Sequence, residues 1–426
     1  MTPAGRLDAA IALLGAIEAD RRPADAVANE FLRNRRFIGG GDRRDISEIT
    51  WSVLRARRRL GWWLERIGAP VTPRLLALAM MVLGGMTPHR AESNFGGSRF
   101  APAPLDEVEK RALAQLATHT LDHPNMSDGV RLEIPDFVVD KFRARFGARL
   151  DAECAAMLIQ APLDLRVNLL KTTREAAMEA LARDRLRAEP TKLSPWGLRL
   201  AARQHVTASA AFRDGLVEIQ DEGSQLVALL ADVKPGMRVV DYCAGAGGKT
   251  LALAMMMENK GHLVACDVSA PRLDAAIKRL RRAGVHNAER HLFAAGDKWP
   301  KRQERKCDVV LIDAPCTGTG TWRRNPDARL RLTAQDLAEL TVKQASILDE
   351  AQRLVRPGGH LIYATCSVLD EENDAQIEAF LTRHTQFALV PLDETWPEHI
   401  RAPMLRLSPA RDQTDGFFAA RLVCRG

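Results

Sequence analysis

The second half of the chain alternates apolar runs of strand length with segments of helix length. From Leu230 onward the strand-like runs cover residues 237–242, 262–267, 289–293, 308–314, 360–365, 387–390 and 417–423. Strands separated by helices predict a mainly parallel, doubly wound α/β sheet, because a parallel connection needs a crossover of helix length. Ligands bind such sheets beyond the carboxyl ends of the strands. We therefore expect the functional site where these runs end.

A glycine-rich turn follows the first of these runs. The segment Asp241-Tyr-Cys-Ala-Gly-Ala-Gly-Gly-Lys-Thr250 lies between the apolar run 237–240 and a helix-compatible segment, which is the context of a nucleotide-type cofactor loop. Its end resembles a phosphate-binding loop, but Cys243 occupies the position of that loop's first glycine. We therefore do not expect a nucleoside triphosphate as the ligand.

Two acidic residues after the next strands suit an adenosine cofactor. Asp267 ends the second run, where a carboxylate can accept hydrogen bonds from both ribose hydroxyls, although it can also cap the helix expected over 270–282. Asp297 follows the third run and can meet the adenine amino group or lie in a plain turn. Dehydrogenases share a glycine loop with a following acid, so these features leave the reaction open.

Two cysteines at strand ends favour methyl transfer. Cys316 closes Asp313-Ala-Pro-Cys, and Cys366 lies in Tyr363-Ala-Thr-Cys-Ser367. Carbon 5 of a pyrimidine is a poor nucleophile until a thiolate adds to carbon 6. A free thiol has a pKa of about 8.5, so the site needs nearby positive charge, for which Lys249 and a sulfonium cofactor are candidates. We expect only a packing role for the other cysteines at 154, 266, 307 and 424.

The composition describes a globular chain with surplus positive charge. The 426 residues are 46% hydrophobic, and 61 Lys and Arg against 54 Asp and Glu give a net charge of +7. The surplus favours a polyanionic partner, although basic clusters such as those near Arg57 and Arg281 also suit solvated helix faces. Seven cysteines without a Cys-x-x-Cys pair predict no disulfide framework, no metal site and a reducing cytoplasm. The apolar stretch 75–86 is too short for a bilayer, so we expect no membrane contact.

Three regions are expected along the chain. Residues 1–130 show apolar residues at helical spacing, interrupted by Gly39-Gly40-Gly41 and by a loop rich in Gly, Ser and Pro over 87–104. Residues 131–229 are typical of a small α+β module, and residues 230–426 form the doubly wound domain. The elements expected in the middle region are a helix at 135–145, a strand at 165–170, a helix at 173–182, and short strands around Leu198 and Val217.

Several motifs extend over most of the chain. They are Asp-x-Cys-Ala-x-x-Gly-Gly-Lys-Thr at 241–250, Asp-Ala-Pro-Cys-x-Gly-x-Gly at 313–320, Tyr-x-Thr-Cys-Ser at 363–367 with Glu371-Glu372-Asn373, Asp415-Gly-Phe-Phe418, Arg166-Val-Asn168 and Gln220-Asp-Glu-Gly-Ser-Gln225. Together they resemble the Sun (Fmu) family of RNA cytosine-5 methyltransferases over roughly residues 135–424. The resemblance implies a Rossmann-like class I methyltransferase domain that uses S-adenosyl-L-methionine.

The resemblance also implies a division of labour. In that family the cysteine at the position of Cys366 is the nucleophile, and the cysteine at the position of Cys316 assists release of the methylated base. The residues at Lys249 and Asp313 contact the cytosine. DNA cytosine-5 enzymes use the Pro-Cys position as the nucleophile, so Thr365-Cys366 implies RNA. The expected cofactor-binding residues are Cys243, Ala244, Gly245, Ala246, Gly247, Gly248, Lys249, Asp267, Arg272, Asp297 and Asp313.

Two parts of the chain match the family pattern less closely. The helical region with Arg44-Asp45 and residues 46–55 is similar to the NusB-like RNA-binding domain of bacterial 16S rRNA members, with an anonymous packing domain as the alternative. The cofactor loop has Ala244-Gly245-Ala246 where the family has Ala-Ala-Pro, and we expect weaker or more flexible cofactor binding at worst.

The sequence thus predicts a monomeric enzyme that methylates carbon 5 of a cytosine in structured RNA, expected to be 16S rRNA. The target base must leave its stack to reach Cys366. One alternative is a tRNA cytosine-5 methyltransferase with the same chemistry. The other is a non-catalytic RNA-binding assembly factor, which the joint presence of Cys316, Cys366, Lys249 and Asp313 disfavours.

Overall fold

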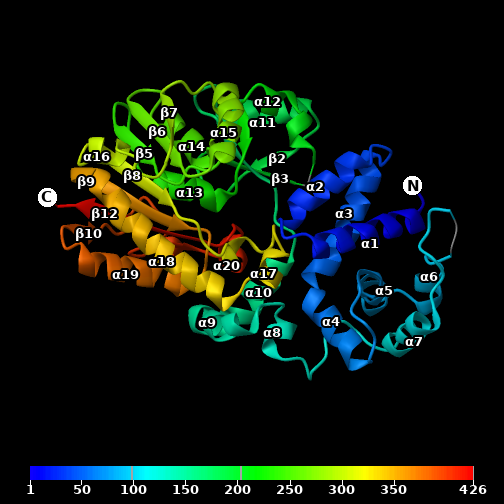
Figure 1. Cartoon of the computed structure of the whole chain (residues 1–426). Helices are drawn as coiled ribbons and strands as arrows, with labels where there is room; N and C mark the ends of the chain where they lie inside the picture. Colours follow the sequence, from blue (N-terminus) through cyan, green and yellow to red (C-terminus); the bar gives the residue numbers. More distant parts are fainter. Residues whose placement is uncertain (97–98, 202–203, 426) are drawn as a thin grey trace. The chain divides into compact units, whose positions relative to one another are not determined.

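The computed structural model describes residues 1–96, 99–201 and 204–425 (Figure 1). The chain forms two compact units, and it passes from one to the other more than once. Unit 1 comprises Met1–Leu158 and Trp322–Thr333, and unit 2 comprises Ile159–Thr321 and Ala334–Gly426. Among the described residues, no helix has the length and apolar character that crossing a bilayer requires.

The described residues of unit 1 form helices and loops. The α-helices are α1 (Pro3–Ala19), α2 (Ala24–Asn34), α3 (Gly40–Arg55), α4 (Arg57–Arg66), α5 (Pro73–Leu83), α6 (Pro88–Glu92), α7 (Glu107–Leu116), α8 (Asp128–Arg131), α9 (Asp136–Phe146), α10 (Leu150–Leu158) and α17 (Ala328–Arg331). Local signals set several of their starts: Thr2 and Thr72 cap α1 and α5 ahead of prolines, and Asp106 forms a capping box with Glu109 at α7. Leu13, Leu60, Trp63 and Leu76 are buried in the common core.

Two expectations for this region need correction. The glycine run was expected to interrupt the helical region, and a boundary does lie there, since α2 ends at Asn34 and Gly39 is the N-cap of α3; Gly40 and Gly41, however, form the first turn of α3. Helix α6 lies within the loop expected over 87–104, because Thr87-Pro88 provides a helix start. Residues 97–98 of that loop lie outside the described part of the chain.

Unit 1 extends beyond the boundary expected near residue 130. Helices α8 to α10 belong to it, and Glu133, which is fully buried, pairs with Arg59 of α4 at 3.1 Å. The segment Trp322–Thr333 also belongs to unit 1, which nothing in the local pattern indicated. The ring of Trp322 packs 5.5 Å from that of Phe142, and the buried Arg329 guanidinium donates to the carbonyl of Arg55.

Unit 2 contains a small antiparallel sheet before the large one. Its strands are β1 (Asp164–Val167), β2 (Ala188–Pro190), β3 (Gly197–Leu200) and β4 (Val217–Ile219), in the order β2-β3-β1-β4. Helices α11 (Arg174–Arg183) and α12 (Ala210–Arg213) accompany it. The expected strand at 165–170 ends early, because Asn168 Oδ1 accepts the N–H of Leu170 and turns the chain. The short, mostly exposed β2 was not expected from the sequence.

The large sheet confirms the doubly wound prediction. Its strands are β5 (Arg238–Asp241), β6 (His262–Asp267), β7 (Ala288–Leu292), β8 (Cys307–Asp313), β9 (Val355–Thr365), β10 (Phe387–Leu389), β11 (Leu405–Leu407) and β12 (Phe417–Cys424). The order is β10-β12-β9-β8-β5-β6-β7, with β11 paired to β12. Strands β5 to β9 run parallel, and β10, β11 and β12 pair antiparallel. The fold is thus a Rossmann-like class I methyltransferase fold with a mixed sheet.

Helices cover both faces of this sheet (Figure 1). They are α13 (Glu222–Leu230), α14 (Gly248–Met256), α15 (Ala270–Ala283), α16 (Trp299–Arg302), α18 (Ala334–Ala351), α19 (Asp374–Arg383) and α20 (Pro409–Asp412). Neighbouring strand residues point to opposite faces: Val239 packs with α13 and α14, whereas Val240 packs with α18 and α19. Because both faces are buried, the inner strands are apolar runs rather than alternating ones, whereas the edge strand β7 is polar and largely exposed.

Candidate active site

The glycine-rich, cofactor-type loop connects β5 to α14, and hydrogen bonds from neighbouring elements hold it. Gly245 and Gly247 have positive φ angles of +54° and +80°, which favour glycine. A Cβ on Gly245 would lie 2.8 Å from the Arg272 guanidinium. The N–H of Ala244 donates to the carbonyl of Cys266 at 2.8 Å, and Arg279 donates to the carbonyl of Ala246 at 2.6 Å. These bonds hold the Gly245-Ala246 segment, where the motif departs from its usual form.

A cavity of about 900 Å³ opens beyond the carboxyl ends of β5, β6 and β8. Every site residue predicted from the sequence except Gly247 lines it. These residues are Cys243, Ala244, Gly245, Ala246, Gly248, Lys249, Asp267, Arg272, Asp297, Asp313, Cys316 and Cys366. The structure therefore brings together residues that are up to 123 positions apart in the chain, from Cys243 to Cys366. What each of them does there remains a prediction.

Asp267 lines the cavity and also supports the loop. Its Oδ2 accepts the N–H of Gly245 and its Oδ1 accepts the N–H of Ser269, both at 2.8 Å. Arg272 lies 3.9 Å from the same carboxylate. The side chain of Ser269, the N-cap of α15, makes no capping hydrogen bond. Asp267 therefore forms a turn before α15, and it presents a buried carboxylate to the cavity.

Asp297 is held by two neighbours. Its Oδ1 accepts the N–H of Trp299 at 2.8 Å, and its Oδ2 lies 2.5 Å from His291 Nε2. The Trp299 N–H is the main reason that the pKa of Asp297 is lowered, with His291 adding to the effect. The indole of Trp299 stacks on His291 with ring centroids 4.5 Å apart. A carboxylate oxygen accepts more than one hydrogen bond, so Asp297 can still receive a donor from the cavity.

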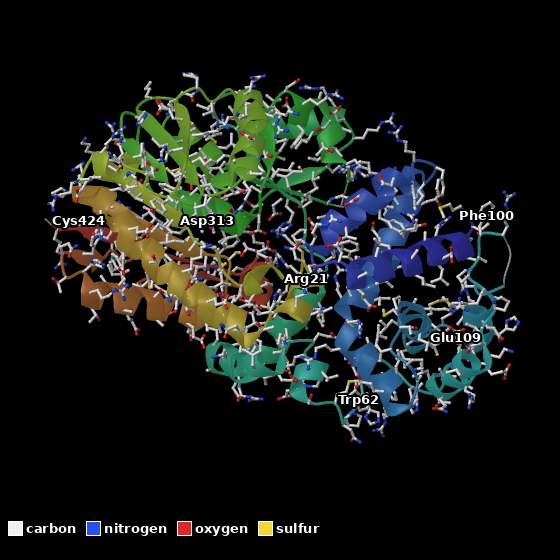
Figure 2. All side chains as sticks on the ribbon, viewed as in Figure 1. Arg21, Trp62, Phe100, Glu109, Asp313 and Cys424 are labelled. Atoms are coloured by element: carbon white, nitrogen blue, oxygen red, sulfur yellow. The ribbon has the colours of Figure 1, made fainter. Side chains whose placement is uncertain are left out.

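Lys249 and Asp313 form a buried ion pair beside the cavity. Lys249 lies in the first turn of α14 and is 7% exposed, and its Nζ donates to Asp313 Oδ2 at 2.7 Å. Asp313, labelled in Figure 2, ends β8. Burial alone lowers the pKa of Lys249, but the charge and hydrogen bond of Asp313 outweigh it and raise that pKa. The site therefore holds a fixed positive charge paired with a carboxylate that is partly accessible.

Cys316 and Cys366 lie together at the sheet edge. Their Sγ atoms are 3.4 Å apart, and both side chains are half-buried. The hydrogen bond between the two thiols and burial raise the pKa of Cys316 well above its ordinary value. The charge of Cys366 is among the causes that raise the pKa of Lys249. The other cysteines differ: Cys154, Cys266, Cys307 and Cys424 are buried, as expected from the sequence.

One face of α18 was missed by the sequence analysis. Lys343, Ser346, Ile347 and Glu350 line the cavity, and Glu350 accepts a hydrogen bond from the Tyr242 hydroxyl at 3.2 Å. These four residues have the i, i+3, i+4, i+7 spacing of one helical face. That spacing could have been recognised in the sequence. A helix that follows a site loop and has polar and apolar residues on one face is a candidate for lining the cavity.

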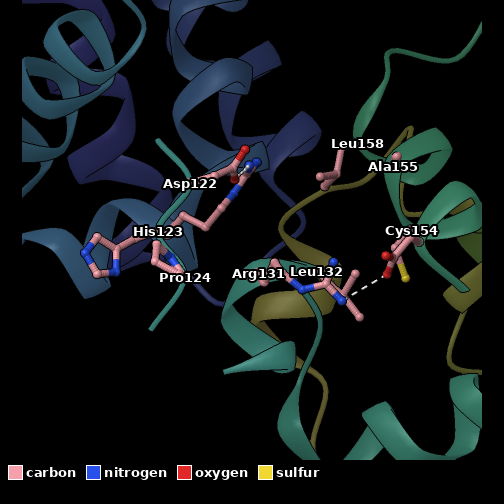
Figure 3. Close-up of a pocket in the computed structure, with 10 residues that line it drawn as sticks. Asp122, His123, Pro124, Arg131, Leu132, Cys154, Ala155 and Leu158 are labelled. Carbon is pink, nitrogen blue, oxygen red and sulfur yellow. Dashed lines mark hydrogen bonds and ion pairs between the residues drawn. The ribbon is translucent and has the colours of Figure 1, made fainter. Parts of the chain in front are cut away.

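The arginine cluster in α3 and α4 is engaged inside unit 1. Arg57 pairs with Glu18, Arg58 with Asp136, and Arg59 with Asp122 and Glu133. Arg59 of this cluster lines a second cavity of about 530 Å³, and Figure 3 labels others of its lining residues, such as Asp122 and Arg131. Arg131 lines this cavity and pairs with Asp151 across 2.9 Å. The cluster is therefore neither a solvated helix face nor a set of unpaired cations.

Comparison with known proteins places the geometry in a family. The family model described as "16S rRNA methyltransferase RsmB/F" matches residues 228–423, and the RsmF/B-like ferredoxin-like domain matches residues 134–207. The probable ribosomal RNA small subunit methyltransferase B of Synechocystis sp. is 31% identical over 408 residues, covering 89% of this chain and 91% of that protein. The methyltransferase B of Pectobacterium atrosepticum is 29% identical over 413 residues, covering 92% of each chain.

Solved structures agree with these relatives. The crystal structure of PH0851 has a TM-score of 0.81 at 27% identity and covers 99% of both chains. A methyltransferase homolog protein from Pyrococcus horikoshii has a TM-score of 0.61 at 30% identity, covering 71% of this chain and 99% of that one. The shared sequence and fold lead to one conclusion. The chain belongs to the RsmB/F family of 16S rRNA methyltransferases, which the sequence motifs had indicated as the Sun (Fmu) family.

Proposed function

We propose that this protein methylates carbon 5 of a cytosine in 16S rRNA through a covalent adduct with Cys366. The observation that carries the proposal is the pair of thiols, 3.4 Å apart, which line the same cavity as the Lys249–Asp313 ion pair. One thiol suits attack on carbon 6, and the second suits the proton transfer that must precede release.

The cavity fits the family's cofactor, S-adenosyl-L-methionine. Its volume of about 900 Å³ lies within the range of small-molecule sites, and a glycine-rich loop and a buried carboxylate stand on its wall. The loop residues 243–248 suit the amino acid part of the cofactor, Asp267 the ribose hydroxyls, and Asp297 the adenine amino group. When bound, the cofactor supplies a methyl group on a positively charged sulfur.

The chain's own residues divide the reaction. Cys366 adds to carbon 6 of the cytosine, and carbon 5 then becomes enamine-like and attacks the methyl group. Asp313 accepts a hydrogen bond from the amino group on carbon 4, and the bond from Lys249 holds Asp313 in place. Cys316 takes the proton that carbon 5 still carries. The electrons of that bond form the carbon 5–carbon 6 double bond and expel Cys366.

Unit 1 is proposed to bind the RNA through exposed arginines on α2, α3 and the connection between them. Arg33, Arg36 and Arg44 are exposed. They lie close together in the chain, and exposed cations of this kind can replace the counterions of phosphates. The NusB-like identity of this region stays a prediction, supported by its helical structure.

Trapping the adduct tests the proposal. Cys366→Ala should abolish methylation and leave cofactor affinity nearly unchanged. Cys316→Ala should still attack and methylate, and then accumulate a protein–RNA adduct that survives denaturing electrophoresis and carries the labelled methyl group. The adduct should disappear in the double variant. Cys424→Ala, at a buried cysteine outside the cavity, is the control.

Normal turnover of Cys316→Ala, or an adduct that persists without Cys366, would show that the roles are wrong. Bisulfite mapping of RNA from cells with and without the protein identifies the substrate. Loss of a modified cytosine from 16S rRNA is expected, whereas a loss confined to tRNA would contradict the proposed substrate.

A further inference from the structure

Glu372 and Asn373 are adjacent buried residues between the two cysteine loops. They lie where the short 3-10 helix Asp370–Glu372 meets α19, and they are 0% and 1% exposed. Neither lines the cavity, so neither touches the reacting atoms. Asn373 instead binds the residues on both sides of Cys366, and Glu372 binds Thr317 directly and Pro315 through Gln344.

Glu372 holds the loop that carries Cys316. Its carboxylate accepts the N–H of Thr317 at 2.8 Å and also the Thr317 hydroxyl. A third donor is Gln344 Nε2 of α18, at 3.0 Å, and the same Nε2 donates to the carbonyl of Pro315 at 2.9 Å. The residues before and after Cys316 are thus tied to a single carboxylate.

Asn373 holds the loop that carries Cys366. Its Oδ1 accepts the Thr365 hydroxyl at 2.6 Å, and its Nδ2 donates to the carbonyl of Ser367 at 3.0 Å. The Ser367 hydroxyl lies 2.9 Å from that of Thr319, and the N–H of Gly320 donates to the carbonyl of Cys366 at 3.0 Å. The two loops are therefore fixed to each other, which sets the distance between the Sγ atoms.

Glu372 and Asn373 differ in charge. Three donors satisfy the buried carboxylate of Glu372. Asn373 is neutral. The pKa of Cys316 is raised first by the hydrogen bond to Cys366 and by burial, and then by the charges of Cys366 and Glu372. The negatively charged residue of the two, Glu372, thus acts on Cys316.

The positive charge lies on the other side of the pair. The Cys366 thiolate is among the groups that raise the pKa of Lys249, which also pairs with Asp313. Lys343 and Glu350 of α18 line the same cavity, and the buried Tyr363 hydroxyl donates to the carbonyl of Glu372 at 2.7 Å. These groups belong to the charged and titratable surroundings of the two thiols.

We propose that Glu372 and Asn373 are positioning residues, and that the charge of Glu372 keeps the proton on Cys316 so that Cys366 is the thiol that attacks. This inference rests on the proposed function of the two cysteines. It explains how two similar thiols, 3.4 Å apart, take different roles.

The proton and electron balance follows from this arrangement. Before attack, the pair carries one negative charge, on Cys366, and Cys316 donates its S–H to it. Once Cys366 has bonded to carbon 6 it is a neutral thioether, and Cys316 can release its proton to water. The Cys316 thiolate then takes the proton from carbon 5, and Cys366 leaves as a thiolate. The nearby Glu372 carboxylate makes the Cys316 thiolate a stronger base for that step.

Residue-resolved alkylation tests the charge effect directly. Full-length protein is treated with iodoacetamide across a pH series, and modification of Cys316 is followed by peptide mass spectrometry. In Glu372→Gln, which removes the charge and nearly keeps the shape, Cys316 should react several-fold faster near pH 8, about tenfold for each pH unit by which its titration moves down. Glu378→Gln, at an exposed position of α19, is the matched control and should react like the wild type.

Methylation assays with the same variants give a second readout. Glu372→Gln should accumulate more methylated adduct than the wild type and less than Cys316→Ala, because its Cys316 is a weaker base. A merely loosened loop would lower attack and release together. Unchanged alkylation of Cys316 in folded Glu372→Gln would overturn the inference.

A second variant covers the case in which Glu372→Gln does not fold. Gln344→Met removes one of the donors that favour the charged form of the buried carboxylate, so alkylation of Cys316 should become faster; slower or unchanged alkylation would also overturn the inference. Alkylation needs neither RNA nor cofactor. A wild-type protein that methylates no cytosine would therefore refute the proposed function without deciding the alkylation result.

Discussion

Asp241→Asn tests the electrostatics beneath the cofactor loop. Asp241 ends β5 and is 1% exposed, and its Oδ2 accepts the Thr250 hydroxyl at 2.7 Å. Its Oδ1 has no hydrogen-bond partner within the part of the chain that the structure describes. Burial is the main reason that its pKa rises from 3.8 to about 7, and the charges of Asp313 and Asp267 raise it further. The Thr250 hydroxyl and Lys249 act in the opposite direction.

The sign of the pH effect follows from these two pKa values. Between pH 3.8 and about 7 the folded protein holds a proton that the unfolded chain has released, so the free energy of unfolding falls as the pH rises. The stabilising contribution is full below the lower value and lost above the upper one. At about 1.4 kcal/mol for each pH unit, the loss amounts to at most about 4 kcal/mol. Asparagine has no charge to bury, and its oxygen can still accept from Thr250.

Scanning calorimetry of the full chain at pH 8 and pH 4 checks this. For a domain of this size, each kcal/mol shifts the midpoint by about 2–4 °C, so the transition of unit 2 should rise by up to about 16 °C at pH 8. The buried amide of asparagine reduces this gain. At pH 4 the difference from the wild type should shrink toward zero.

Asp308→Asn provides a control of opposite sign. Burial alone would raise the pKa of Asp308, but the Arg238 N–H and the Arg356 guanidinium outweigh it and lower that pKa. Its contribution is present above the unfolded pKa and lost as the pH falls, so this variant should be less stable than the wild type at pH 8. If Asp241→Asn lowered the midpoint equally at both pH values, the argument from burial would be refuted.

Two further predictions concern the ligands. Asp267→Ala should raise the dissociation constant for S-adenosyl-L-methionine at least tenfold, since each charge-assisted hydrogen bond is worth about 1.5–3 kcal/mol. Calorimetry measures this constant. Unchanged binding would mean that Asp267 serves only to hold Gly245 and Ser269. Replacing Arg33, Arg36 and Arg44 with glutamine should reduce the slope of log affinity for 16S rRNA against log salt concentration by about 0.7–0.9 for each phosphate that the variant no longer neutralises. An unchanged slope would remove these arginines from the RNA interface.

Much of unit 2 was predictable because its signals are local. The run His262–Asp267 is a strand with the expected bounds, and helix 270–282 differs from α15 by one residue. Strands buried on both faces are short apolar runs, and the turns at their ends contain the glycines and acids that a ligand edge needs. The positions of the candidate site residues around one cavity follow from the same rule, since parallel strands end at one edge.

Other features depend on interactions that leave no local pattern. Trp322–Thr333 follows the Cys316 loop in the chain yet belongs to unit 1, where Asp327 accepts the N–H of Ala24 at 2.9 Å. The arginines of α4 looked like a basic surface in the sequence, but their carboxylate partners, such as Glu133, lie far along the chain. Charge runs alone therefore overestimate the surface that is available to RNA.

The small sheet explains why one motif lies outside the doubly wound domain. Arg166 of β1 is 2% exposed, and it donates to the carbonyl of Gly248 at 2.9 Å, where α14 begins. Burial lowers the pKa of Arg166 to about 10, which still leaves it charged at neutral pH. Asn168, two residues later, donates to the carbonyl of Ala283 at 2.8 Å, where α15 ends.

Arg166 and Asn168 together connect the end of β1 to the start of α14 and to the end of α15, the two helices beside the cofactor loop. Gln220 adds to this brace, because its Oε1 accepts from Arg166 at 2.6 Å while its side chain lines the cavity. Both bonds come from Nη1 of Arg166, so one guanidinium nitrogen joins the Gly248 carbonyl to Gln220. The motif Arg166-Val-Asn168 is therefore explained by its support of the cofactor loop.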